Sequence, residues 1–204
     1  MDLNKAVNAL RMKRPAFHSE ADFQFALAWE IQTTYPNAEI RLEYPAVKKA
    51  KEYVDILIKH EGSVYPVELK YKTRKLSFEL GDESYNLKNH GAGDFGSYDF
   101  VKDICRLEGF TSNIDGYKQG YAIWLTNDPY YWNPPRKSNT GAAAFRVYHG
   151  STKTGTLAWG SAMTNTHGRE SPLTLTREYT ISWQDYSEVT QGSMGIFKYA
   201  LIEV

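Results

Sequence analysis

Residues 53–72 constrain the fold of this chain more than any other segment, because they contain two strand-like stretches separated by a short polar turn. Tyr53–Lys59 and Val64–Lys72 carry apolar residues at every second position, which is the pattern of β-strands. The four residues between them, HEGS at 60–63, are typical of a turn. We therefore expect an antiparallel β-hairpin, around which the rest of the chain builds a sheet.

The register of this hairpin follows from its apolar positions. A slip by one residue would turn one apolar set to the opposite face, so both sets are expected on one face: Val54, Ile56 and Ile58 with Val67, Leu69 and Tyr71. The four-residue loop lets Lys59 meet Val64. Asp55 then lies directly opposite Glu68 on the other face, and Lys70 lies one same-face step beyond Glu68.

Two carboxylates directly opposed on a sheet repel each other, so this pair needs an explanation. They can coexist if one is protonated, if a base intervenes or if a cation bridges them. The alternative is an exposed hairpin face with ordinary surface charges, including a Glu68–Lys70 surface pair. The apolar neighbours on both strands favour central strands that are covered on both sides, where charges are scarce. We therefore predict that Asp55 and Glu68 bind a divalent cation, with Lys70 beside it.

Asp55, followed on the next strand by ELK at 68–70, resembles the motif of the PD-(D/E)XK nuclease superfamily, the restriction-endonuclease-like enzymes. Glu20, in the helix predicted to begin near Ser19, stands where many of these enzymes have a first-helix glutamate. The sequence departs from the motif at Val54, where the name-giving motif has proline. The resemblance covers residues 19–127.

The resemblance implies hydrolysis of phosphodiester bonds, in DNA more than in RNA, with Asp55, Glu68, Lys70 and Glu20 as catalytic residues. Mg²⁺ (or Mn²⁺) would be held by Asp55, Glu68, Glu20 and the backbone carbonyl of Leu69. The metal would activate a water, and Lys70 would orient or deprotonate that water and offset negative charge. For Glu20 the alternative is a helix-stabilising acidic residue in a first turn.

Basic residues around the hairpin and on the next helix are the candidate contacts to nucleic-acid phosphates: Lys48, Lys49, Lys72, Arg74, Lys75 and Lys102. A solvated strand end or helix face is the alternative for each. The chain contains 24 Lys and Arg and 24 Asp and Glu, so its net charge is zero. That balance argues against a protein that coats nucleic acid, but not against an enzyme with basic residues near one cleft.

The predicted fold class is α/β (α+β), a restriction-endonuclease-like central mixed β-sheet flanked by helices, with a β-rich C-terminal extension. Residues 1–127 would form the nuclease-like core and residues 128–204 an extension packed on the same domain. The elements expected are a helix from Ser19 to Pro36, strands at 38–44, 53–59, 64–72 and 121–126, a helix at 99–107, and strands within 142–149, 156–160, 173–183 and 195–204. Residues 76–96 are expected to be irregular.

Composition narrows the remaining possibilities. The single cysteine excludes a disulfide framework and a cysteine-based zinc site within one chain. No apolar run approaches the ~18 residues of a membrane span, and the N-terminus lacks the apolar stretch of a signal peptide. We therefore expect a cytoplasmic protein with no membrane partner.

Two rival functions use the same residues. A different hydrolase or a phosphotransferase could employ the same carboxylates. A non-catalytic module with a nuclease-like fold could bind protein or nucleic acid instead, and could form a homo-oligomer through its aromatic tail. Fold alone does not decide among these functions.

Overall fold

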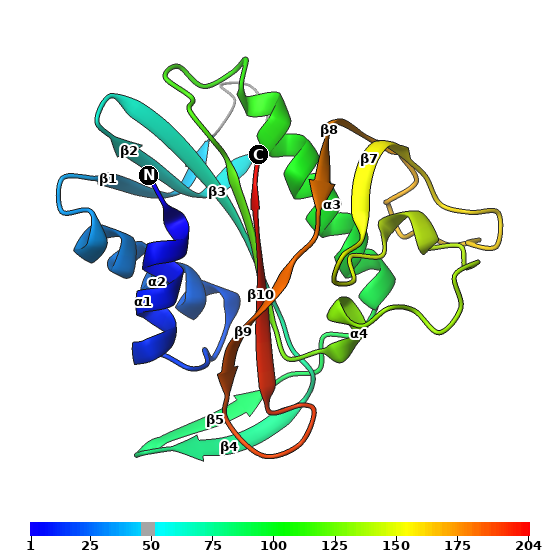
Figure 1. The fold of residues 1–204 in the computed structure, drawn as a ribbon, viewed down its shortest axis with the longest axis horizontal. Coiled ribbons are helices and arrows are strands. Elements are labelled where there is room, and N and C mark those ends of the chain that lie inside the picture. Colours follow the sequence, from blue (N-terminus) through cyan, green and yellow to red (C-terminus); the bar gives the residue numbers. More distant parts are fainter. Residues whose placement is uncertain (46–51) are drawn as a thin grey trace.

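The computed structural model describes residues 1–45 and 52–204, and a six-stranded mixed sheet forms its centre (Figure 1). Its strands in spatial order are β1 (Glu39–Pro45), β2 (Tyr53–His60), β3 (Ser63–Lys72), β6 (Tyr121–Thr126), β10 (Ile196–Glu203) and β9 (Trp183–Glu188). β3 and β6 are parallel, and the other neighbours are antiparallel. Lys48 and Lys49, two of the predicted phosphate contacts, lie outside the described residues.

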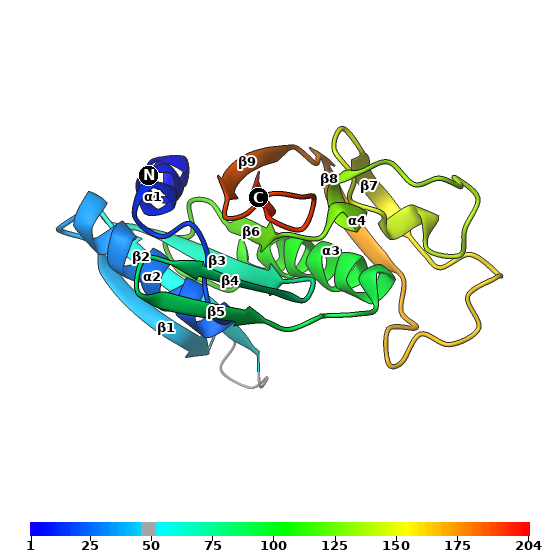
Figure 2. The same ribbon diagram turned by 90° about the horizontal axis from the view of Figure 1, so that it is seen from below.

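Helices cover both faces of this sheet, which confirms the predicted arrangement of a mixed sheet flanked by helices (Figures 1 and 2). α1 (Leu3–Lys13) and α2 (Glu20–Thr34) pack on one face, and α3 (Gly93–Phe110) packs on the other. A hairpin of β7 (Thr152–Leu157) and β8 (Leu173–Thr180) lies against α3. No helix within residues 1–45 and 52–204 is long and apolar enough to cross a membrane.

α2 begins where the sequence predicts. The Ser19 side chain accepts a hydrogen bond from the backbone N–H of Asp22 and so caps the helix. Phe23, Leu27 and Ile31 recur at helical spacing and are buried against the sheet. This placement fixes Glu20 in the first turn of α2.

Several segments differ from the prediction. α1 is an additional N-terminal helix. Residues 76–96, expected to be irregular, form the hairpin of β4 (Leu76–Leu80) and β5 (Glu83–Leu87) and the start of α3, because Phe78 and Tyr85 stack across the two strands. Residues 142–149, expected to form a strand, contain a 3-10 turn at Ala143–Phe145 instead, because Phe145 packs into the core beside α3.

The segment after residue 127 completes the central sheet. A short helix, α4 (Pro129–Trp132), follows β6. β10 pairs along β6 and places β9 at the sheet edge, so the predicted extension supplies two of the six central strands.

Candidate active site

The candidate site lies where β2 and β3 separate. The two strands pair from His60 and Ser63 to Ile56 and Val67, in the predicted register. Beyond that point β2 continues only with β1, and β3 continues only with β6. The cross-strand pair expected between Asp55 and Glu68 is therefore not formed.

The predicted common face of Val54, Ile56 and Ile58 is also wrong at Val54. Ile56 and Ile58 lie in the core beneath α1 and α2, whereas Val54 lies in the core beneath α3. The side chains of Val54 and Ile56, two residues apart on β2, therefore point to opposite faces of the sheet. The side chain of Asp55, between them, turns along the sheet toward β3. Gln24 of α2, which is buried, holds this point by donating a hydrogen bond to the Asp55 carbonyl oxygen at 2.7 Å.

Side chains cap the edge of β3 that β2 leaves open. Asp55 Oδ2 accepts a hydrogen bond from Leu69 N at 2.6 Å, and Glu20 Oε2 accepts one from Tyr71 N at 2.7 Å. Because buried backbone N–H groups need partners, the two carboxylates replace the missing strand. They bind N–H groups two residues apart, about 7 Å along the strand. The fold therefore brings Asp55 and Glu20 to one edge, although Glu20 itself is an exposed residue.

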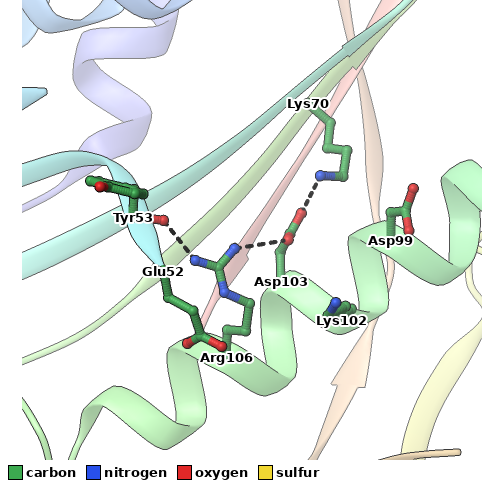
Figure 3. Close-up of a pocket in the computed structure, with 7 residues that line it drawn as sticks. All are labelled: Glu52, Tyr53, Lys70, Asp99, Lys102, Asp103 and Arg106. Carbon is green, nitrogen blue, oxygen red and sulfur yellow. Dashed lines mark hydrogen bonds and ion pairs between the residues drawn. The ribbon is translucent and has the colours of Figure 1, made fainter. Parts of the chain in front are cut away.

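Lys70 lies on the face of β3 that meets α3 (Figure 3), and Glu68 lies on the same face, where it contacts Arg106 of α3. Lys70 Nζ forms an ion pair with Asp103 Oδ2 at 2.6 Å. Arg106 Nη2 lies 3.2 Å from Glu68 Oε1 and donates a hydrogen bond to the Tyr53 carbonyl oxygen at 2.6 Å. A cavity of about 370 Å³ opens over these groups, lined by Glu52, Tyr53, Lys70, Asp99, Lys102, Asp103 and Arg106.

The contributions of Asp103 and Arg106 were not predicted from the sequence. Together with Asp99 and Lys102 they recur along α3 at spacings of three and four residues, which places all four on one helix face. That face meets the cavity instead of open solvent. Lys102, the predicted phosphate contact on this helix, is exposed at the cavity.

Burial controls the protonation of the two motif carboxyl groups. Burial, together with the charges of Asp103 and Glu20, raises the pKa of Asp55 to about 6, against the opposing hydrogen bond from Leu69 N. For Glu68, burial and the charge of Asp103 raise the pKa to about 9, despite the nearby Arg106. The charge of Asp55 also raises the pKa of Glu68. Both therefore lack enough positive charge in their surroundings.

At Lys70 the neighbouring charges outweigh the effect of burial on the pKa. Burial disfavours its charged form, but the charge and hydrogen bond of Asp103, with a smaller contribution from Glu20, outweigh burial and raise the pKa of Lys70. Lys70 is thus a protonated amine at neutral pH. Its position is set by Asp103, whose side chain is only 7% exposed.

The donor set at this site suits a hard divalent cation. Glu68 Oε1 is buried and accepts no hydrogen bond, although Arg106 Nη2 lies 3.2 Å away as an ion-pair partner. The Leu69 carbonyl is directed to the same open edge as the Leu69 N–H that Asp55 caps, because both groups of one residue point to one side of a strand. Within the described residues no three His, Cys, Asp or Glu side chains are gathered in a metal-binding arrangement. The oxygen donors of Asp55, Glu68 and Leu69 fit a cation by their chemistry. Arg106 occupies part of the space beside Glu68.

No protein-family model, curated protein or solved structure matches this chain.

The other basic residues predicted to contact phosphates are distributed around the site. Arg74 forms an ion pair with Asp128 at 3.1 Å, and Asn127 accepts a hydrogen bond from its backbone N–H, so Arg74 fastens the end of β3 to the segment after β6. Lys75 is exposed. Lys72 lines a second, smaller cavity beside Glu20.

The raised pKa of Glu68 predicts that stability falls as the pH rises. The folded carboxyl has a pKa of about 9 against an ordinary value of 4.5, so between these values the folded state holds a proton that the unfolded state has lost. Its contribution is complete below the ordinary pKa and disappears as the pH passes the folded pKa. Between these values Glu68 alone should lower the free energy of unfolding in urea by at most about 1.4 kcal/mol per pH unit.

Glu68→Gln is the control for this prediction. Glutamine keeps the size of the side chain but does not titrate, so the variant should lose most of the slope and keep the smaller part that Asp55 contributes with the same sign. A wild-type stability that rises from about pH 6 to about pH 9 would contradict the assignment.

Proposed function

We propose that this protein is a metal-dependent nuclease that hydrolyses phosphodiester bonds in DNA, with Asp55, Glu68 and Lys70 at its centre. The observation that carries the proposal is the pair of carboxyl groups where β2 leaves β3, Glu68 buried and Asp55 half-buried, both with raised pKa values and next to a protonated lysine. The resemblance of Asp55 and residues 68–70 to the PD-(D/E)XK motif agrees with this assignment.

Asp55, Glu68 and the Leu69 carbonyl are the groups that would hold Mg²⁺ or Mn²⁺, and Glu20 would add a direct or water-bridged contact. When bound, the cation supplies Lewis-acid activation of the phosphate and of a water. Binding would require Arg106 to withdraw from Glu68, and the cavity beside Tyr53 gives its side chain room to do so.

Lys70 acts in this proposal as a fixed positive charge. Because Asp103 raises its pKa, Lys70 holds its proton near neutral pH and is a poor general base. The ammonium group is instead suited to stabilise negative charge that develops on the phosphate oxygens. The raised pKa of Lys70 supports this electrostatic role over deprotonation of the water.

The surroundings of the cavity suit a nucleic-acid strand. Lys102 is exposed at the cavity, and Lys72 and Lys75 continue from β3 beyond Lys70. Tyr53 is 49% exposed at the same opening, which leaves its ring free to stack on a base. These residues would supply phosphate contacts and stacking without giving the whole protein a basic character.

A second candidate function is a non-catalytic module with a nuclease-like architecture that binds protein or nucleic acid. The observation in its favour is that ion pairs already engage the motif residues: Lys70 with Asp103, and Glu68 with Arg106. A site neutralised in this way has less need of a metal ion. The two functions differ in whether the protein binds a divalent cation through Asp55.

Calorimetric titration with Mg²⁺ and with Mn²⁺, on the wild type and on Asp55→Ala, tests the proposal. We expect the wild type to bind the cation and the variant to lose at least about tenfold in affinity, because a carboxylate ligand is removed. The same samples should be assayed on supercoiled, linear and single-stranded DNA. A wild type that binds neither cation and cleaves none of these substrates would leave the binding module as the function.

A further inference from the structure

We propose that the cavity between the start of α2 and the end of β3 is a phosphate-binding subsite, which holds a phosphate group of the nucleic-acid substrate next to the site of cleavage. The cavity measures about 200 Å³ and is lined by His18, Ser19, Glu20, Tyr71, Lys72, Thr73, Lys88 and His90. The binding of phosphate is argued from the cavity alone. Its place in the substrate rests on the proposed nuclease function.

The positive charge of this cavity comes from Lys72 and Lys88. Neither ammonium group has an ion-pair partner among the described residues. The charges of both lysines reach the His90 ring, because each lowers the pKa of His90. Two lysines without carboxylate partners among the described residues, both lining one cavity, are suited to an anion with several acceptor oxygens, such as phosphate.

His90 adds a hydrogen-bond donor with a fixed orientation. Its Nδ1 accepts a hydrogen bond from Thr73 N at 3.0 Å, so the proton of the neutral ring is on Nε2. Burial and the two lysines lower the pKa of His90, which keeps the ring neutral at physiological pH. The ring therefore presents an Nε2–H donor, and His90 N donates to the Thr73 carbonyl oxygen at 2.7 Å to hold the loop in place.

The remaining polar groups of the cavity are largely engaged. Glu20 is its one lining carboxylate, and its Oε2 accepts the hydrogen bond from Tyr71 N. The His18 ring contacts Glu83 at 2.9 Å and stacks on Tyr85, and Thr73 Oγ1 donates to the Lys88 carbonyl oxygen. With two ammonium groups and one carboxylate, the cavity keeps a net positive charge. The N-terminus of α2 adds favourable electrostatics at Ser19 and Glu20.

The position of the cavity links it to the candidate active site. Leu69 and Tyr71 on the open edge of β3, and Thr73 directly after its end, are alternate residues whose N–H groups are capped in turn by Asp55, Glu20 and His90. Asp55 and His90 therefore cap positions four residues apart, about 13 Å along one strand. A nucleic-acid strand that follows this edge would place one phosphate at the carboxylates and another at Lys72, Lys88 and His90.

Binding of inorganic phosphate, followed by NMR of the His90 ring and by calorimetry, tests the subsite. We expect Lys88→Ala and Lys72→Ala each to weaken phosphate binding by about tenfold, the loss of one charge-assisted contact. Lys118→Ala is the matched control, because Lys118 is exposed at the opposite end of β3 beside Val64. A wild type that does not bind phosphate, or lysine variants that bind it as the wild type does, would overturn the proposal.

DNA duplexes with a 5′-phosphate or a 5′-hydroxyl, bound without divalent cations, then identify the source of the phosphate. A preference for the 5′-phosphate that disappears in Lys88→Ala assigns the subsite to a strand end. Equal binding of both duplexes that Lys88→Ala weakens assigns it to an internal phosphodiester. Phosphate binding that depends on Lys88 in a protein that cleaves nothing would keep the subsite and remove the nuclease function. A protein that cleaves DNA but does not bind phosphate would keep the nuclease function and remove the subsite.

Discussion

Replacement of Lys70 by methionine is expected to lower the rate of DNA cleavage by about 100-fold to 1,000-fold, the loss typical of one preorganised group that stabilises transition-state charge. Methionine keeps much of the length and apolar surface of lysine but removes the ammonium group. The affinity for Mg²⁺ should stay the same or increase, because Lys70 is not a ligand in the proposed site and its positive charge opposes a nearby cation. Single-turnover cleavage and calorimetry measure the two effects separately.

Two further variants make this prediction specific. Lys70→Met leaves the buried Asp103 without its 2.6 Å partner, so a loss of activity could reflect a disturbed fold. The double variant Lys70→Met/Asp103→Leu removes the whole pair, and it should fold while remaining inactive. Cleavage by the double variant within about tenfold of the wild-type rate would show that Lys70 has no such role.

The hairpin itself could be predicted because its determinants are local. Alternation along residues 53–59 and 64–72 and the turn between them fix the pairing of Lys59 with Val64 and of Ile56 with Val67. The parting of the strands at Asp55 could not be predicted in this way. It depends on the continued pairing of β2 with β1 and of β3 with β6. It also depends on the Asp55 side chain, which takes the place of a backbone hydrogen-bond partner for Leu69 N.

The rest of the site depends on contacts between distant segments. Glu20 could be placed in a first helical turn from its neighbours, but its hydrogen bond to Tyr71 N requires the packing of α2 against β3. Asp103 and Arg106 belong to a polar face of α3, and such a face is more often solvated. The burial of Asp103 on this face follows from the position of α3 over β3, which the sequence pattern does not specify.

The C-terminal strands illustrate the same limit. Alternation in residues 195–204 predicts a strand, and β10 is one. Its partner is β6, more than seventy residues earlier in the chain, and only this pairing places the C-terminal segment inside the central sheet. Hydrophobic alternation identifies a strand but carries no information about which distant strand it joins.

Replacement of Asp103 by leucine is expected to lower the free energy of unfolding by about 3–5 kcal/mol, because it leaves the Lys70 ammonium group buried and unpaired. The two side chains are only 18% and 7% exposed, so solvent cannot replace the lost partner. Arg106, which lies 3.6 Å from the Asp103 carboxylate and pairs with Glu68, also loses a neighbour of opposite charge. Urea unfolding at neutral pH measures the effect.

The double variant Lys70→Met/Asp103→Leu should recover most of this loss, since exchanging a buried ion pair for apolar residues of similar size is often neutral or stabilising. The exposed pair of Glu39 and Arg41, at 62% and 55% exposure, provides the matched comparison, and Glu39→Leu should cost less than about 1 kcal/mol. If Asp103→Leu is as stable as the wild type, the Lys70–Asp103 contact is not a buried ion pair in solution. Lys70 would then be free to lose its proton, and its proposed role as a fixed charge would have to be replaced by that of a base.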